Sequence, residues 1–262
     1  MTAVTWTWLY YSSFLEDLEK TLEFLMKYNK EEGSAIKSDF QSILPKRENR
    51  DSILQFMEEI NLVGVMPSRR TSRYSITEEG RRYLQSENRP KYLHRQLYKH
   101  VLHYSYFYNY ILENEFYQFS KLQIIEKMVL NSSYDFGVRI FDWKSAENVL
   151  KLMVDLGVLS LDKENDIYSV NREYQTEFNH KVFEELIIDR LSSDTQMFTK
   201  DLCSYLLSRE GEFINSDDEP TIRMIYKHLL RVNESKDILK FIPGLPRPPI
   251  PSKHTLVELR RG

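Results

Sequence analysis

Residues 34–85 read SAIKSDFQSILPKRENRDSILQFMEEINLVGVMPSRRTSRYSITEEGRRYLQ. Apolar side chains recur at helical spacing on both sides of Pro45, which predicts two short helices, because the residue before a proline avoids the helical conformation. Two short apolar runs then flank a basic loop, which predicts a β-hairpin. Thr77 and the two glutamates after it predict the start of a closing helix, since threonine caps free N–H groups and acids favour the first turn.

The helix ends in this stretch are predicted from its small polar residues and glycine. Ser34 is expected to cap the first helix, and Asp51 or Ser52 the second, because their side-chain oxygens can accept from free backbone N–H groups. Gly64 lies within the stop after the second helix and is available for a left-handed conformation. Upstream, the apolar stripe of residues 14–30 predicts another amphipathic helix.

Two helices followed by a hairpin resemble a winged helix-turn-helix domain, and the run YSITEEG at 74–80 is similar to the end of the wing in many prokaryotic winged-helix regulators. The resemblance implies that the second helix enters the major groove of DNA and that the wing lies beside it. The DNA-contacting residues that it implies here are Lys37, Lys46, Arg47, Arg50, Arg69, Arg70 and Arg73. The alternative is that the arginines form a solvated loop tip.

Residues 119–170 repeat this pattern and predict a second winged-helix domain. Helices are expected after Ser120 and Ser145, a strand after Gly157, and a returning strand at 167–170. The turn at 162–166 is net acidic, so no phosphate contact is expected from it.

Residues 178–262 predict a third copy, with strands at 238–242 and 256–259. The loop between them is rich in proline and basic residues, and it is either a long wing or a peptide for a protein partner. As a wing it would contact DNA through Arg247 and Lys253.

Residues 90–118 are predicted to form one long helix that is apolar on several faces, which indicates a buried helix or an interface. The residues expected at an interface with a partner or a second copy are Leu97, Val101, Tyr104 and Tyr108. His100 and His103 share a face and could ligate a metal. Packed or solvated imidazoles are expected instead, because no carboxylate pair or cysteine is near, so neither a metal nor a cofactor is predicted.

The expected fold is therefore mainly α with small β-hairpin wings, an α+β chain of tandem winged-helix domains joined by an aromatic-rich helix. The expected boundaries are an N-terminal arm with the first domain at 1–89, the linking helix at 90–118, the second domain at 119–175 and a third at 176–262. The arm holds Trp6 and Trp8. It is expected to pack on the chain itself, with docking on a partner as the alternative.

The composition constrains the environment and the partners. The net charge is −3, yet nine lysines and arginines face three acids between Arg69 and Lys99, and local charge matters more than the sum. The single cysteine, Cys203, lies in an apolar helical pattern and is expected in the core. One cysteine excludes an internal disulfide and fits a reducing compartment, so a cytoplasmic protein is expected. No secretory signal or membrane-spanning stretch is visible.

Catalytic motifs are scarce. The chain has no phosphate-binding glycine loop, H-E-x-x-H or G-x-S-x-G. Asp135 with Asp142 and Lys144 resembles the skeleton of a metal-dependent nuclease site, where carboxylates hold Mg²⁺. The competing interpretation, a surface loop entering a helix with Trp143 packed in the core, is preferred. The chain is therefore predicted not to be an enzyme.

Two functions remain in competition. The first is a non-enzymatic protein that binds double-stranded DNA through the first helix-turn-helix and its arginine-rich wing, as a regulator or a subunit of a DNA-associated complex. The alternative is a scaffold subunit of a chromosome-organising or DNA-defence complex, because tandem winged-helix proteins also resemble the accessory subunits that bind the kleisin of bacterial condensins. The expected partners are double-stranded DNA, a second copy or a larger protein complex.

Overall fold

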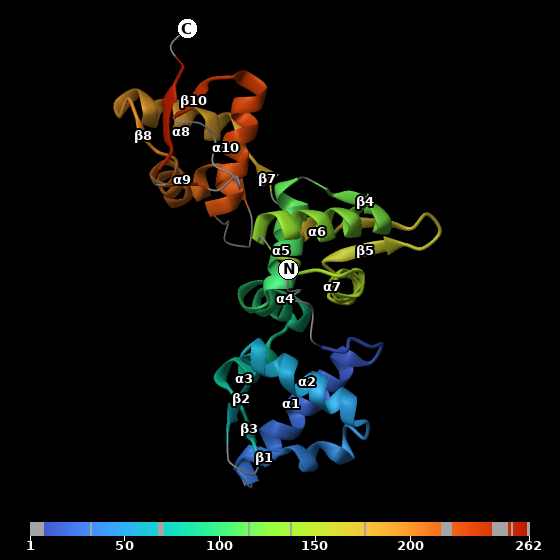
Figure 1. Ribbon diagram of the computed structural model, residues 1–262. Helices are drawn as coiled ribbons and strands as arrows, with labels where there is room; N and C mark the ends of the chain where they lie inside the picture. The colour runs from blue at the N-terminus through green and yellow to red at the C-terminus, as the bar shows by residue number, and fades with distance from the viewer. Residues whose placement is uncertain are drawn as a thin grey trace. The chain divides into compact units, whose positions relative to one another are not determined.

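The computed structural model describes residues 8–31, 33–67, 71–114, 116–136, 138–175, 177–215, 222–242, 251–252 and 254–260. The described chain is mainly helical and carries small antiparallel sheets, an α+β fold with short hairpins (Figure 1). The predicted fold class is confirmed at this level. The chain divides into two compact units, the first formed by Met1–Tyr108 with Phe119–Ser169 and the second by Asn109–Gln118 with Val170–Gly262.

The first module of unit 1 surrounds a core of aromatic side chains. Its elements are α1 (Phe14–Glu31), β1 (Ala35–Ile36), the 3₁₀-helix η1 (Lys37–Ser42), α2 (Arg47–Glu59), β2 (Val63–Met66), β3 (Arg73–Ile76) and α3 (Glu78–Gln85). The sheet order is β1-β3-β2. Phe14 and Phe56 are fully buried and meet edge to face, with ring centroids 5.0 Å apart.

Several helix ends differ from the sequence predictions. Ser34 does not cap the first helix; its Oγ instead accepts from Arg73 at 3.4 Å, and the Asp39 carboxylate accepts from the backbone N–H of Ile36 at 2.8 Å. Helix α2 begins at Arg47, so Asp51 and Ser52 lie inside it. The Thr77 cap is confirmed, because its Oγ1 accepts from the N–H of Gly80 at 3.0 Å.

The predicted linking helix is two helices, α4 (Arg89–His100) and α5 (Leu102–Glu113). Val101 is extended at φ −109° and ψ 105°, a conformation that β-branched residues accept readily, and it interrupts the helix. Asn88 caps α4 by accepting from the N–H of Lys91 at 3.0 Å. The predicted interface residues Leu97, Val101, Tyr104 and Tyr108 are all buried, so their side chains are part of the chain's own packing.

The second module follows with β4 (Gln118–Ser120), α6 (Lys121–Phe136), α7 (Trp143–Asp155), β5 (Leu159–Asp162) and β6 (Ile167–Val170). Its sheet order is β4-β6-β5. The described part of the N-terminal arm packs within unit 1, as expected. Trp8 is buried, and the Tyr10 hydroxyl donates to Asp155 of α7 at 2.5 Å. Trp6 lies outside the described residues.

Unit 2 holds the third module. Its elements are η2 (Arg172–Tyr174), β7 (Glu177–Phe178), α8 (His180–Ser193), β8 (Met197–Phe198), α9 (Thr199–Ser208), η3 (Glu210–Glu212), β9 (Ile214–Asn215), α10 (Ile222–Lys236), β10 (Leu239–Ile242) and β11 (Leu256–Leu259). Its strands form a three-stranded sheet of order β10-β11-β8 and a separate two-stranded pair, β7-β9. Cys203 is buried in this core, as predicted, and burial raises the pKa of its thiol to about 12.

The three modules repeat one chain order and one backbone device. In each, a short strand, two helices and a hairpin follow one another, and the sheet places the last strand between the other two. The residue between the second helix and the hairpin has a positive φ in all three, 60° at Asn61, 71° at Gly157 and 51° at Asp237. The left-handed residue is therefore Asn61 in the first module, and Gly64 lies in β2.

Gly157→Ala is expected to destabilise the protein by about 1 kcal/mol, because an L-residue in the left-handed region is strained. A Cβ at Gly157 would meet no atom within 4 Å, so the backbone alone carries the effect. Gly157→Asn is the matched control and should lose less, since Asn61 holds the equivalent place. Urea unfolding of both variants measures the difference. Equal stability of the alanine variant and the wild type would contradict this account.

Candidate nucleic-acid interface

Most of the described basic residues predicted to contact DNA in the first module already have partners within the chain. Asp51 forms ion pairs with both Lys37 and Arg47, the second at 3.8 Å. Arg50 donates through Nη1 to the carbonyls of Leu44 at 2.5 Å and Pro45 at 3.0 Å. Arg50 therefore stabilises the turn before α2, and a DNA contact would have to displace these bonds.

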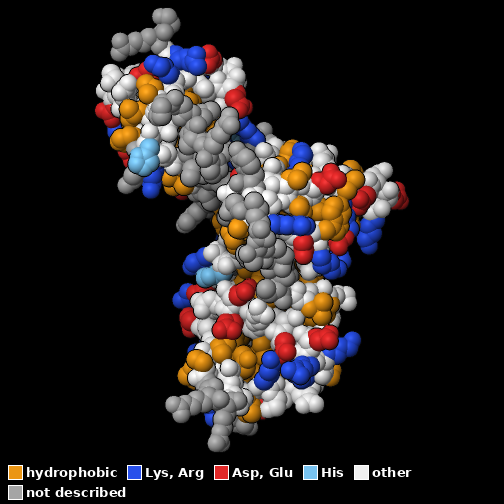
Figure 2. All heavy atoms as spheres, in the orientation of Figure 1, with side chains coloured by type: hydrophobic (Ala, Val, Ile, Leu, Met, Phe, Trp, Pro, Cys, Tyr) orange, Lys and Arg blue, Asp and Glu red, His pale blue; other side chains and the backbone are white. Residues whose placement is uncertain are grey.

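The solvent face of α2 is also unsuited to a polyanion. Its exposed residues are Arg47, Glu48, Gln55, Glu58 and Glu59. Figure 2 shows acidic side chains next to basic ones near the lower end of the view, where Figure 1 places α2. Three carboxylates against one guanidinium repel phosphate, so this face is a poor candidate for the DNA-reading helix.

The remaining predicted DNA contacts divide into two groups. Lys46 and Arg73 are exposed. Arg69, Arg70, Arg247 and Lys253 lie outside the described residues.

Helix α4 presents a different basic surface, here called the α4 cation row, formed by Lys91, Arg95 and Lys99. These residues are four apart, so they share one helix face at about 6 Å intervals along the axis. Arg95 and Lys99 are exposed, and neither forms an ion pair with any described residue. The helix itself contains no aspartate or glutamate.

Neighbouring carboxylates are engaged by other side chains. Glu79 accepts from Tyr92, from Gln96 at 3.3 Å and from Arg82 at 3.1 Å. Burial and the Glu79 carboxylate raise the pKa of Tyr92 to about 12. The Glu79 carboxylate is therefore bonded to side chains other than Arg95 and Lys99.

The row was visible in the sequence but was not predicted as a site. Lys91, Arg95 and Lys99 recur at four-residue spacing in a run without acids, within the excess of basic residues from Arg69 to Lys99. The winged-helix resemblance implies DNA contacts from the second helix and the wing. It therefore directs attention to the basic residues of the hairpin and away from those of α4. The helical periodicity of the charges was the signal that could have found the row.

The two carboxylates of the nuclease-like set have structural roles, and its lysine, Lys144, is exposed. The Asp142 carboxylate caps α7 by accepting from the N–H of Ser145 at 2.6 Å, and Asp135 accepts from the Tyr106 hydroxyl at 2.7 Å. No group of three or more potential metal ligands is found in the described part of the chain. The prediction that Trp143 packs in the core is wrong, because its side chain is 43% exposed.

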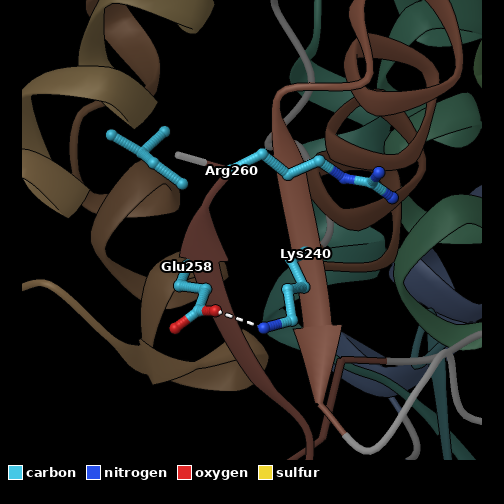
Figure 3. Close-up of a pocket in the computed structure, with 4 residues that line it drawn as sticks. Lys240, Glu258 and Arg260 are labelled. Carbon is cyan, nitrogen blue, oxygen red and sulfur yellow. Dashed lines mark hydrogen bonds and ion pairs between the residues drawn. The ribbon is translucent and has the colours of Figure 1, made fainter. Parts of the chain in front are cut away.

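A hollow of about 770 Å³ in the third module is lined by Lys240, Glu258, Leu259 and Arg260. Figure 3 shows Lys240 and Glu258 turned towards each other, 2.9 Å apart, and Arg260 extending the other way. Arg260 pairs with Asp237 at 3.0 Å. Because the charges that line the hollow are paired with one another or with Asp237, we do not assign a binding or catalytic site to it. Among the described helices, none is long and apolar enough to cross a membrane.

Comparisons with known proteins give distant structural matches. No family model and no curated protein matches the chain. One matching solved structure is titled as that of the restriction endonuclease FokI, with 10% identity and a TM-score of 0.34, covering 84% of this chain and 49% of that one. Another, titled magnesium ion-bound SspB, has 10% identity and a TM-score of 0.38, covering 98% of this chain and 84% of that one. The chain thus spans about half the length of the endonuclease.

These comparisons overturn two predictions made from the sequence. A match to a restriction endonuclease is at odds with a non-enzymatic DNA-binding protein or scaffold as the function, and with the prediction that the chain is not an enzyme. Both predictions are withdrawn. The TM-scores are too low for the matches to assign an activity in their place, and no family membership follows from them.

Proposed function

We propose that this protein binds nucleic acid through the α4 cation row, and that double-stranded DNA is the form bound there. The observation that carries the proposal is the row itself. Two exposed cations without ion pairs in the described chain, Arg95 and Lys99, continue the line of Lys91 on a helix without acids. A short series of cations along a helix matches a phosphate backbone, which carries one negative charge about every 1.7 Å of duplex axis.

The chain order supports a tandem winged-helix protein as the architecture of this proposal. Three successive modules of strand, two helices and hairpin, each with the same sheet order, agree with the resemblance drawn from the sequence. The proposed contact differs from the family's usual one, because it uses α4 after the first hairpin and leaves α2 facing solvent. The proposal concerns binding and assigns no catalytic step.

The test is a salt series of binding to a labelled duplex with the double variant Arg95→Ala/Lys99→Ala. Loss of two phosphate contacts should weaken binding about tenfold at low salt and make the slope of log K against log salt shallower by about two. The matched control is Lys27→Ala/Lys30→Ala, which removes two exposed cations from α1 of the same unit.

The control variant should bind like the wild type. If both double variants weaken binding equally, net charge explains the effect and the α4 cation row is not the contact. If the wild type does not bind duplex DNA at low salt, the proposed function is overturned.

A further inference from the structure

The second module exposes a tryptophan at the start of α7. Trp143 is the first residue of that helix, and its side chain is 43% exposed. A large aromatic ring left in water costs free energy that burial against a partner would recover. The other tryptophan that the structure describes, Trp8, is 5% exposed and packs on Phe56 with ring centroids 4.6 Å apart.

Basic residues lie on both sides of Trp143 in the sequence. Arg139, Lys144 and Lys151 are exposed, and none of the three forms an ion pair with any described residue. The Nε of Arg139 donates to the carbonyl of Phe141 at 2.9 Å, which holds this side chain beside the entry to α7. Lys144 directly follows the tryptophan on the helix.

The carboxylates of α7 and its cap are engaged within the chain. Asp142 accepts the N–H of Ser145, Glu147 pairs with Lys121, and Asp155 accepts from Tyr10. The bond from Lys121 is the main cause that lowers the pKa of Glu147, and the charges of Lys151 and Lys144 lower it further, so this ionised carboxylate also attracts the lysines of α7. The start of α7 therefore presents an exposed aromatic ring, and the exposed cations Arg139 and Lys144 lie close to it in the sequence.

This combination is the one that binds a nucleic-acid strand with open bases. Aromatic side chains offer a platform on which a base stacks, and adjacent cations hold the flanking phosphates. In an intact duplex the bases already stack on one another, so the ring gains most from an unpaired base. The β5–β6 turn carries Asp162, Glu164 and Asp166. Because these carboxylates repel phosphate, the nucleic-acid strand is expected to avoid that turn.

We propose that Trp143, flanked by Arg139 and Lys144, is a stacking site for an unpaired nucleobase of DNA. The inference rests on the proposed function and extends it with a second contact in unit 1. The α4 cation row holds duplex phosphates, and Trp143 holds a base at a single-stranded or distorted position. The two sites share no residue, so each can be changed without the other.

The test titrates the full chain with an oligothymidine and with a blunt duplex of equal length, while tryptophan emission is recorded. Oligothymidine should quench the emission, and Trp143→Ala should weaken its binding about tenfold. Trp143→Phe should restore most of the affinity, because phenylalanine keeps an aromatic face. Thermal melting of each variant checks folding, and the exposed position predicts melts close to the wild type.

The two proposals fail in different ways. Unchanged oligothymidine binding by Trp143→Ala, or quenching that persists in that variant, overturns the stacking site and leaves the α4 cation row standing. The expected separation is duplex binding that is weakened about tenfold in Arg95→Ala/Lys99→Ala and unchanged in Trp143→Ala. Absence of binding to either probe by the wild type overturns both.

Discussion

Gly80→Ala is expected to destabilise the protein by about 3 kcal/mol. A Cβ at Gly80 would lie 2.3 Å from the carbonyl oxygen of Leu62 and 2.8 Å from Cγ1 of Ile76. The first of these atoms is backbone, so α3 would have to move away from β2. Alanine gains about 1 kcal/mol over glycine in a helix, and this gain is smaller than the cost of the overlap. Urea unfolding followed by circular dichroism measures the loss.

Gly64→Ala is the control for Gly80→Ala within the same module. The nearest atom to a Cβ at Gly64 is the Oγ of Ser75 at 3.5 Å, an ordinary contact. Its stability should stay within about 0.5 kcal/mol of the wild type. If the two variants lose equal free energy of unfolding, the close approach of α3 to the Leu62 carbonyl is not the cause of the loss in Gly80→Ala.

His228→Phe is expected to remove much of the acid sensitivity of the third module. His228 is 2% exposed and stacks on Phe178 with ring centroids 3.7 Å apart, and neither of its ring nitrogens has a hydrogen-bond partner in the part of the chain that the structure describes. Burial is the first cause that lowers its pKa to about 3, and the charges of Arg231, His180 and Lys227 add to it. The folded chain therefore keeps this imidazole neutral through most of the acid range.

The sign of the pH effect follows from proton binding. Below about pH 6.5 the unfolded chain protonates His228, and the folded chain does not until about pH 3. The free energy of unfolding should then fall by about 1.4 kcal/mol per pH unit across this window, amounting to a few kcal/mol. Phenylalanine cannot take up a proton, so the variant should lose this slope and be at least as stable at pH 7.

Urea unfolding of the wild type and His228→Phe at several values between pH 3 and pH 7 gives the difference directly. His254→Ala removes an exposed histidine of the same unit and controls for the loss of one imidazole. This variant tests whether the loss of any one histidine of the unit produces the same pH dependence. Parallel pH curves for the wild type and His228→Phe would show that the imidazole takes up its proton equally in the folded and the unfolded chain, and would contradict this prediction.

Local patterns in the sequence predicted much of the fold. Some of these features depend on residues close in the chain: the Thr77 cap, the hairpins before α3 and after α7, and the strands at 238–242 and 256–259. The burial of Cys203 depends on hydrophobicity alone. Hydrogen bonds at helix starts and alternation in strands act over a few residues, so one sequence is enough to detect them. Repetition of the pattern along the chain made each module more evident.

Other features were decided by residues far apart in the chain. Asp51 of α2 pairs with Lys37 of η1 because these two elements fold together, and Trp143 stays exposed although its large apolar side chain predicted a place in the core. The apolar periodicity of residues 90–118 predicts one helix, whereas the extended backbone at Val101 divides it into α4 and α5.

The candidate site divides in the same way. The sequence by itself determined that Lys91, Arg95 and Lys99 share a helix face, because helical periodicity requires it. Only the tertiary structure decided that Arg95 and Lys99 lack ion pairs within the described chain, whereas the predicted contacts of the first module are mostly paired. Ion pairing and exposure depend on which side chains the fold brings within a few ångströms, and sequence spacing does not contain that information.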